Sequence, residues 1–176
     1  MKAKLKDGTE LEILDSPANI PVKSLLRYVN EMIAEDTWLH MRKKVIMKEE
    51  IAWKKSMVSG IRKGDIAMTI AVANGKVAGN CWAHREGPGR VRKNMGMGVA
   101  ISKKFRGIGL GELLFKMTIA KARKEMEAKN IFLTVAEPNK AARKLYEKVG
   151  FRKIARFPDW IERDGKYYAQ LWMVLK

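Results

Sequence analysis

The chain of 176 residues has few of the residue types that build disulfides, metal centres and membrane spans. The single cysteine, Cys81, cannot form a disulfide within the chain, and its strand-like run favours a core thiol over a nucleophile. One cysteine and two well-separated histidines make no ligand cluster, so we expect no metal. No stretch approaches the roughly 18 consecutive apolar residues of a membrane helix, and the first residues lead into a strand-like stretch instead of a signal peptide. These absences predict a cytoplasmic protein with no membrane partner.

Acidic residues are scarce beside basic ones. The chain has 19 Asp and Glu against 36 Lys and Arg, which gives a formal net charge of +17. Such a charge attracts polyanions, nucleic acid among them, yet no RNP-type, K-homology or zinc-finger string is present. The chain also lacks internal repeats and low-complexity linkers. Its length therefore predicts one globular domain, residues 1–176, with a sizeable core.

Hydrophobic patterns and turn residues divide the chain into strands and helices. Polar and apolar residues alternate over 9–14, which predicts a first strand. Apolar residues at helical spacing predict helices at 21–35 and 48–61, and Asn74-Gly75 between apolar runs predicts a hairpin. The other expected elements are strands at 66–73, 76–84, 95–101 and 131–135, helices at 112–128 and 140–149, and strands from 151 to the C-terminus. This order predicts an α/β fold with a mixed central sheet.

A glycine-rich segment, Arg106–Gly111, lies between an expected strand and an expected helix. Glycines at alternate positions allow positive φ and let a ligand approach the backbone. Amides at a helix N-terminus lack intrahelical partners and attract phosphate oxygens. The segment therefore predicts a pyrophosphate site, with an ordinary ligand-free turn as the alternative. Its spacing matches neither the dinucleotide fingerprint nor the P-loop.

A second block follows the apolar run 131–135. Asn139 is a natural N-cap for the next helix, and Gly150 suits the left-handed position after that helix. Between them lie Leu145 and Tyr146, and Phe151 begins a new strand.

The two blocks together resemble the Gcn5-related N-acetyltransferases. Residues 106–111 fit that family's R-x-x-G-x-G motif, and residues 139–151 fit its N-x-x-A-x-x-L-Y-x-x-x-G-F motif. The ending Asp164–Leu175 more weakly resembles members that act on amino-acid-like or protein amines. The resemblance is specific from about 95 to 150, and over 1–64 it rests on the order of elements alone. It implies the mixed sheet of that fold, in which strand 94–101 splays from strand 131–135 and the pantetheine arm of acetyl-CoA enters the gap.

The resemblance also implies roles for individual residues. Tyr146 would give a proton to the departing thiolate, with a core aromatic as the alternative, and Asn139 would bond the pantetheine as well as cap its helix. Arg143 and Lys144 would meet the ribose phosphate or form a solvated helix face. The residues implied to hold acetyl-CoA are Val99, Ala100 and Ile101 at the thioester and pantetheine, and Arg106, Gly107, Ile108, Gly109, Leu110 and Gly111 at the pyrophosphate.

The general base is less defined. Many relatives carry a Glu on the strand that corresponds to 94–101, and this chain has none there. His84 is our first candidate, and Glu86, Glu35 and His40 are the others. A lone histidine is more often structural. The alternative is that water relays the proton to bulk solvent, with no dedicated base.

These features predict an acetyl-CoA-dependent N-acetyltransferase in which a primary amine, on a small molecule or a protein, attacks directly. A polyamine- or antibiotic-modifying enzyme fits the same motifs. The alternative from another class is a basic nucleic-acid-associated module on this fold without turnover. We expect the acceptor pocket between 35–38 and 159–162, where each stretch sets a Trp beside carboxylates suited to an ammonium group. The basic runs 90–93 and 103–106 flank strand 94–101 and predict one basic face near the cofactor entrance, serving mainly to steer coenzyme A; a third basic run is 42–44.

Overall fold

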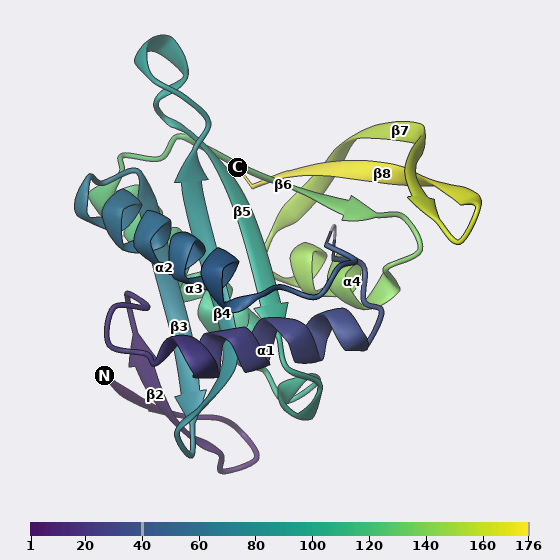
Figure 1. The fold of residues 1–176 in the computed structure, drawn as a ribbon. Coiled ribbons are helices and arrows are strands. Elements are labelled where there is room, and N and C mark those ends of the chain that lie inside the picture. The colour runs from purple at the N-terminus through teal and green to yellow at the C-terminus, as the bar shows by residue number, and fades with distance from the viewer. Residues whose placement is uncertain (40, 176) are drawn as a thin grey trace.

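One twisted sheet runs through the computed structural model, which describes residues 1–39 and 41–175 (Figure 1). Its strands lie in the order β1-β2-β3-β4-β5-β6-β8-β7. Neighbouring strands are antiparallel except β5 and β6, which are parallel. The strands are β1 (Lys2–Lys4), β2 (Glu10–Leu14), β3 (Ile66–Ala73), β4 (Lys76–Arg85), β5 (Asn94–Ile101), β6 (Asn130–Ala136), β7 (Phe151–Arg163) and β8 (Lys166–Leu175).

Helices cover both faces of the sheet. α1 (Val22–Ala34) and α2 (Met47–Arg62) lie in front of β3 and β4 in Figure 1, and α3 (Leu110–Glu125) and α4 (Lys140–Lys148) lie on the other side. Two short 3-10 turns, η1 (Gly89–Val91) and η2 (Lys103–Phe105), precede and follow β5. The structure is therefore the three-layer α/β arrangement that the sequence predicts.

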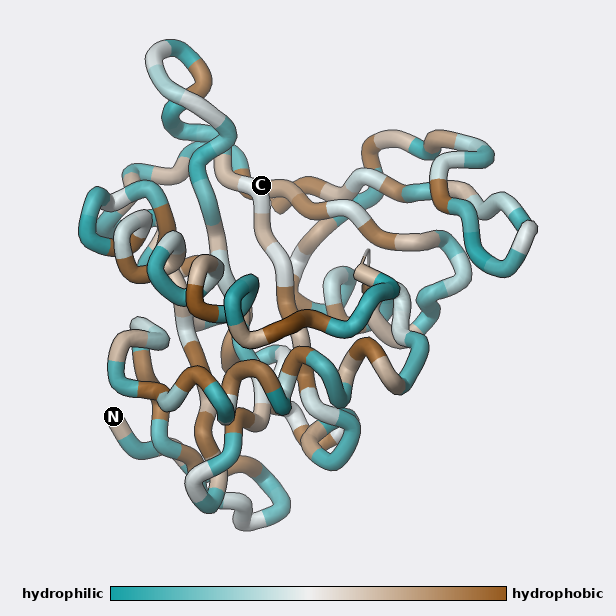
Figure 2. Tube along the Cα trace, viewed as in Figure 1, coloured by the Kyte–Doolittle hydropathy of each residue, from teal (hydrophilic) through white to brown (hydrophobic). Residues whose placement is uncertain are grey.

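The two faces of β4 show how the strand pattern builds two cores. Cys81 and Ala83 are fully buried against α3, where the Thr118 hydroxyl reaches the Cys81 carbonyl at 3.4 Å. Trp82 faces the opposite side, in the core that α1 shares with β3. Successive side chains of a strand point to opposite faces, so one apolar strand serves both layers. Figure 2 shows the resulting hydrophobic sheet centre and the hydrophilic loop between β4 and β5.

The pairing of β5 with β6 is short. Three residue pairs join the strands, from Asn94 opposite Asn130 to Gly96 opposite Phe132, and beyond Gly96 the strands separate. β5 stays paired with β4 as far as Ile101, and β6 stays paired with β8 as far as Ala136. The splay predicted between these two strands is thereby confirmed.

The structure corrects several boundaries. The helix predicted over 112–128 begins at Leu110, because Gly109 with φ 93° is its left-handed N-cap, and it ends at Glu125. β1 was not predicted, since three residues of an edge strand carry too little pattern. β7 continues to Arg163 through two irregularities in its pairing with β8. Cys81 is the expected core thiol, and burial raises its pKa to about 12.

Two absences concern the described residues alone. None of their helices is long and apolar enough to cross a membrane. Within residues 1–39 and 41–175, no group of three or more His, Cys, Asp or Glu side chains could hold a metal ion.

Phe115 of α3 provides the test of the core. Its ring is fully buried and meets Tyr146 and Phe151 edge-on at 5.4 and 5.8 Å between centroids. We expect Phe115→Ala to lower the free energy of unfolding by about 3–5 kcal/mol, because it removes a buried ring and leaves a cavity. Urea unfolding measures this, with Tyr167→Ala, at a residue 64% exposed, as the control. Equal losses in both variants would contradict this assignment of the core.

Candidate active site

A cavity of about 590 Å³ occupies the gap between the open ends of β5 and β6. β5 contributes Val99, Ala100 and Ile101 to its wall, and β6 contributes Thr134, Val135 and Ala136. The remaining walls come from the glycine-rich turn, α4 and the segment after α1. They include Arg106, Gly107, Gly109, Gly111, Asn139, Ala142, Leu145, Tyr146, Lys148, Thr37, Trp38 and Leu39.

Backbone amides of β5 face this cavity. The Ser102 N–H bonds the Ala78 carbonyl on the β4 side. Because backbone groups alternate sides along a strand, the N–H groups of Ile101 and Val99 point toward the gap. β6 pairs with β5 only as far as Gly96, so it supplies no ladder partner there. These amides are free to bond a ligand that enters between the strands.

The glycine-rich turn has the geometry of an anion site. Gly107 and Gly109 have φ values of 79° and 93°, and Gly109 caps α3. A Cβ at either position would meet nothing within 4 Å, so the space above the turn is open. Leu110 is fully buried and Ile108 packs against the same core, so neither side chain lines the cavity. Any contact they make with a ligand uses the backbone, as the sequence predicts.

Arg106 is held by protein groups. Its Nε donates to the Ile101 carbonyl at 2.9 Å, and its Nη2 lies 2.7 Å from Glu35 Oε2. Glu35 is the C-cap of α1, so the arginine joins that helix to the end of β5. The Arg106–Glu35 pair was not predicted, because the two residues are far apart in the sequence. It also makes Glu35 a poor base candidate, since its carboxylate is already paired.

A different lysine from those predicted lies at the cavity. Lys148 lines it and is 2.7 Å from Glu112, which also pairs with Lys116 at 2.8 Å. Hydrogen bonds from both lysines lower the pKa of Glu112 to about 2. Arg143 instead donates to the Glu137 carbonyl at 3.1 Å. Neither Arg143 nor Lys144 lines the cavity, because α4 turns its 141, 142, 145 and 148 side inward.

Tyr146 lines the cavity from α4 and is 8% exposed. Its ring packs edge-on against Phe115, so the residue is also a core aromatic. Burial raises the pKa of Tyr146, and its phenol is therefore neutral and protonated at pH 7. Its hydroxyl has no hydrogen-bond partner within residues 1–39 and 41–175. Asn139 is the predicted N-cap, accepting from the Ala142 N–H at 3.1 Å, and it lies at the same cavity.

Tyr28 is a site residue that sequence reasoning missed. From α1 its hydroxyl donates to the Ala100 carbonyl at 2.7 Å and lies 3.2 Å from Asn80 Oδ1. The side chain is buried, which raises its pKa. The bond fixes β5 where β6 has left it. In the sequence Tyr28 shows only as one member of a helical stripe, which cannot reveal this partner.

His84, the first candidate base, does not line the cavity. Its Nε2 is 3.3 Å from Glu86 Oε1, and both side chains are substantially exposed. A Cβ at position 96 would lie 2.6 Å from the imidazole, so Gly96 makes room for this ring over β5. Gly96 precedes Val99 by three residues, or about 10 Å along the strand. The fourth candidate, His40, lies outside the described residues.

A second cavity of about 280 Å³ adjoins the first and shares Thr37, Trp38 and Leu39 with it. The structure brings together most of the two stretches predicted for the acceptor: Asp36, Thr37 and Trp38 on one wall, and Trp160, Ile161 and Glu162 on the other. Glu35 and Asp159 do not line it.

The groups predicted to hold an ammonium ion there already have partners within the protein. The guanidinium of Arg163 lies 4.6 Å from the centre of the Trp38 ring and pairs with Asp36. Arg42 pairs with Glu162 and Asp164. Arg163 and Arg42 therefore occupy the Trp38 ring and the carboxylates that were predicted to bind the ammonium group of a ligand.

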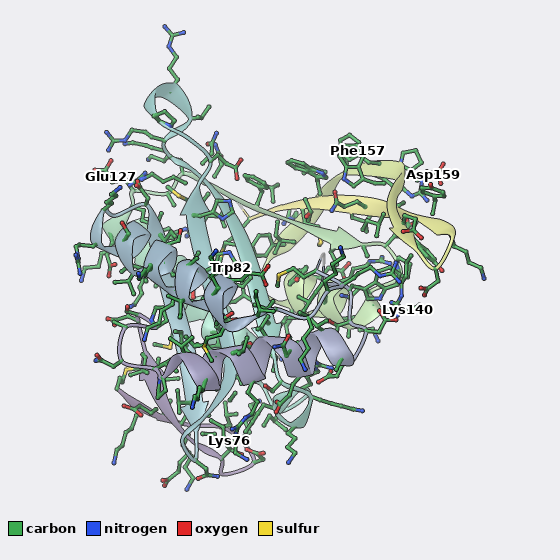
Figure 3. All side chains as sticks on the ribbon, in the orientation of Figure 1. Lys76, Trp82, Glu127, Lys140, Phe157 and Asp159 are labelled. Carbon is green, nitrogen blue, oxygen red and sulfur yellow. The ribbon has the colours of Figure 1, made fainter. Side chains whose placement is uncertain are left out.

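The predicted single basic face is wrong. Arg92 and Lys93 pair with Glu127 at 3.3 and 3.1 Å, at the end of the sheet opposite the Lys76 turn (Figure 3). Residues 103–106 follow the other end of β5. An eight-residue strand separates the two runs by about 25 Å, so only 103–106 adjoins the glycine-rich turn.

The sequence matches a family model over the segments that form the first cavity. The model is that of the acetyltransferase (GNAT) family, and it matches residues 30–151, which include β5, the glycine-rich turn, β6 and α4. The chain belongs to the GNAT acetyltransferase family. A comparison with curated proteins gave no match.

Solved structures share the GNAT fold. A GNAT acetyltransferase from Streptococcus pneumoniae superposes with a TM-score of 0.81 at 24% identity, covering 93% of this chain and 98% of that one. A ribosomal-protein-alanine N-acetyltransferase from Brucella melitensis gives 0.79 at 21% identity, with 93% and 98% covered. A phosphinothricin acetyltransferase from Sinorhizobium meliloti, solved with acetyl-CoA, gives 0.77 at 15% identity, with 93% and 86% covered. That neighbour holds acetyl-CoA. In this chain the cavity between β5 and β6 has a wall of β5 residues that β6 leaves unpaired.

The glycine-rich turn yields a comparison of two variants. We expect Gly109→Val to weaken coenzyme A binding far more than Arg106→Ala. Valine disfavours a φ of 93° and projects into the open space, whereas Arg106 already bonds Ile101 and Glu35. Titration calorimetry measures both affinities. Gly165→Val is the matched control, since Gly165 has φ 73° and equally open surroundings in the β7–β8 turn. Equal losses from Gly109→Val and Arg106→Ala would count against binding mainly through amides.

Proposed function

We propose that this GNAT acetyltransferase transfers the acetyl group of acetyl-CoA to a primary amine by direct attack, without a covalent enzyme intermediate. One observation carries the proposal. Val99 and Ile101 of β5 line the same cavity as Tyr146 of α4, so candidate oxyanion donors and a candidate proton donor meet at one cavity. Acyl transfer from a thioester needs both.

This arrangement predicts how negative charge and protons move during the reaction. The amine nitrogen attacks the carbonyl carbon, and the β5 amides stabilise the oxygen as it becomes negative. The C–S bond then breaks, and the thiolate takes a proton from the Tyr146 hydroxyl. Burial raises the pKa of Tyr146, so its hydroxyl keeps its proton until the thiolate leaves. The phenolate that this transfer leaves on Tyr146 regains a proton from water before the next turnover. The departing ammonium proton reaches His84 through water, across the distance from Gly96 to Val99.

The nucleic-acid module without turnover has less support. Its predicted basic face is divided between the two ends of β5, and Tyr146 would have no function in it beyond packing. Cytoplasmic localisation and the single domain over 1–176 stay predictions.

Tyr146→Phe tests the proton donor. The variant keeps the ring between Phe115 and Phe151 and deletes only the hydroxyl. We expect kcat to fall by roughly 10²-fold with acetyl-CoA affinity little changed, because the lost group acts after binding. Coenzyme A release under saturating acetyl-CoA measures kcat. An unchanged kcat would leave Tyr146 with a packing role alone.

His84→Ala tests the base. We expect kcat/KM for the amine to fall by about 10-fold or more, because the variant lacks the imidazole that accepts the proton. Glu86→Gln, which keeps the imidazole and removes only its neighbouring charge, should cost less. A pH profile of kcat/KM that is identical in wild type and His84→Ala would assign proton removal to solvent.

A further inference from the structure

An aromatic surface lies on the sheet beyond the cavity. It consists of Phe132 on β6, Trp172 on β8, and Phe157 and Trp160 on β7, and we call it the aromatic face. Phe132 stacks on Trp172 with 5.3 Å between centroids and 7° between planes. Phe157 joins Trp172 at 6.0 Å and Trp160 at 5.2 Å. The four rings are thus one continuous cluster.

The register places this cluster on the side of the sheet where an amine must approach. Phe132 pairs with Gly96, over which His84 projects, and Trp172 pairs with Thr134 of the cavity wall. Neighbouring residues in register share a face. The opposite face of β6 and β8 is closed by Leu133, Leu171 and Met173 in the core.

Among the described residues, no helix lies in front of the aromatic face. α1 and α2 pack over β3 and β4 instead (Figure 1). Phe157 is 37% exposed and Trp160 is 59% exposed. Phe157 lies at the outer part of the β7–β8 hairpin, well away from Trp82 at the sheet centre (Figure 3). Exposed clusters of large apolar side chains mark interaction sites on protein surfaces.

Three observations select the occupant. Trp160 also lines the second cavity, which adjoins the first at Thr37, Trp38 and Leu39. β7 lies two strand spacings from β6. The distance from Thr134 on β6 to β7 is therefore about 10 Å, which three residues of extended chain would span. The net charge of +17 attracts an acidic partner. A small amine at the thioester cannot span that distance, whereas a polypeptide can.

We propose that the acceptor of the acetyl group is a polypeptide, with apolar side chains about three to five residues from the reactive amine that pack on Phe157 and Trp160. This inference rests on the proposed function and specifies its acceptor. The residues nearest the amine lie over Phe132 and Gly96, and the following ones cross Trp172 toward β7. Acidic residues farther along strengthen the encounter.

Synthetic peptides test the proposal. One hexapeptide amide carries Leu and Phe at its fourth and fifth positions, its partner carries Gln and Ser there, and a dipeptide amide has the same first two residues. Each is made with a free N-terminus and, separately, acetyl-capped with Lys first. We expect kcat/KM for the apolar hexapeptide to exceed that for both others by 10-fold or more. Equal values for the dipeptide and the apolar hexapeptide would overturn the proposal.

Variants then locate the effect. Trp160→Ala and Phe157→Ala should each lower kcat/KM for the apolar hexapeptide about 10-fold, leave the dipeptide unchanged and leave the KM for acetyl-CoA unchanged. Tyr167→Ala is the matched control, because Tyr167 is an aromatic residue of the same hairpin and is 64% exposed. Its register partner on β7 is Glu162, and its neighbour Tyr168 contacts Trp38. Equal losses in all three variants would overturn the assignment.

A binding measurement separates this proposal from the proposed function. Calorimetry of the apolar hexapeptide against the protein saturated with coenzyme A should show binding that Trp160→Ala weakens about 10-fold. Peptide binding without acetyl transfer would reject the proposed reaction and keep the docking surface. Acetyl transfer to small amines alone would reject the docking surface and keep the reaction. Sedimentation that shows a dimer lost in Trp160→Ala would assign the face to a second copy of the chain.

Discussion

The separation of β5 from β6 after three residue pairs is the constraint on which the site depends. A strand edge that turns away from its neighbour leaves backbone donors and acceptors facing an apolar space, where each one needs a partner. Side chains do not fill the gap, which remains a cavity of about 590 Å³. The ligand that suits it is long, narrow and able to exchange hydrogen bonds with a strand, as the pantetheine arm of acetyl-CoA is.

The open end of β5 needs other support, and two long-range contacts provide it. Tyr28 bonds the Ala100 carbonyl from α1, and Arg106 bonds the Ile101 carbonyl while pairing with Glu35 at the end of the same helix. α1 therefore supports the part of β5 that β6 leaves. Arg106 consequently has less capacity for a further anion, because its guanidinium already bonds Ile101 and Glu35. Gly107, Gly109 and Lys148 line the cavity nearby.

The acceptor side is built from segments that are distant in the chain. Asp36 after α1 pairs with Arg163 at the end of β7, and Arg42 pairs with Glu162 and Asp164. These ion pairs are exposed, and each contributes little to stability. Their effect is on chemistry, since they neutralise the carboxylates around Trp38 and leave the uncharged aromatic face beyond them as the distinctive surface.

Local sequence patterns determined most of the fold and the cofactor side of the site. The glycines at 107 and 109, the N-cap Asn139 and the apolar strands act through backbone conformation or through neighbours a few residues away, so their consequences can be read along the chain. The family resemblance added Tyr146 and the splay. Tertiary structure alone decided which charges meet. Arg163 lies over the Trp38 ring, Lys148 instead of Arg143 lines the cavity, and the two basic runs lie at opposite ends of β5. These distances depend on the register of the strands and on which side each helix turns to the sheet, and the order of residues in the sequence determines neither.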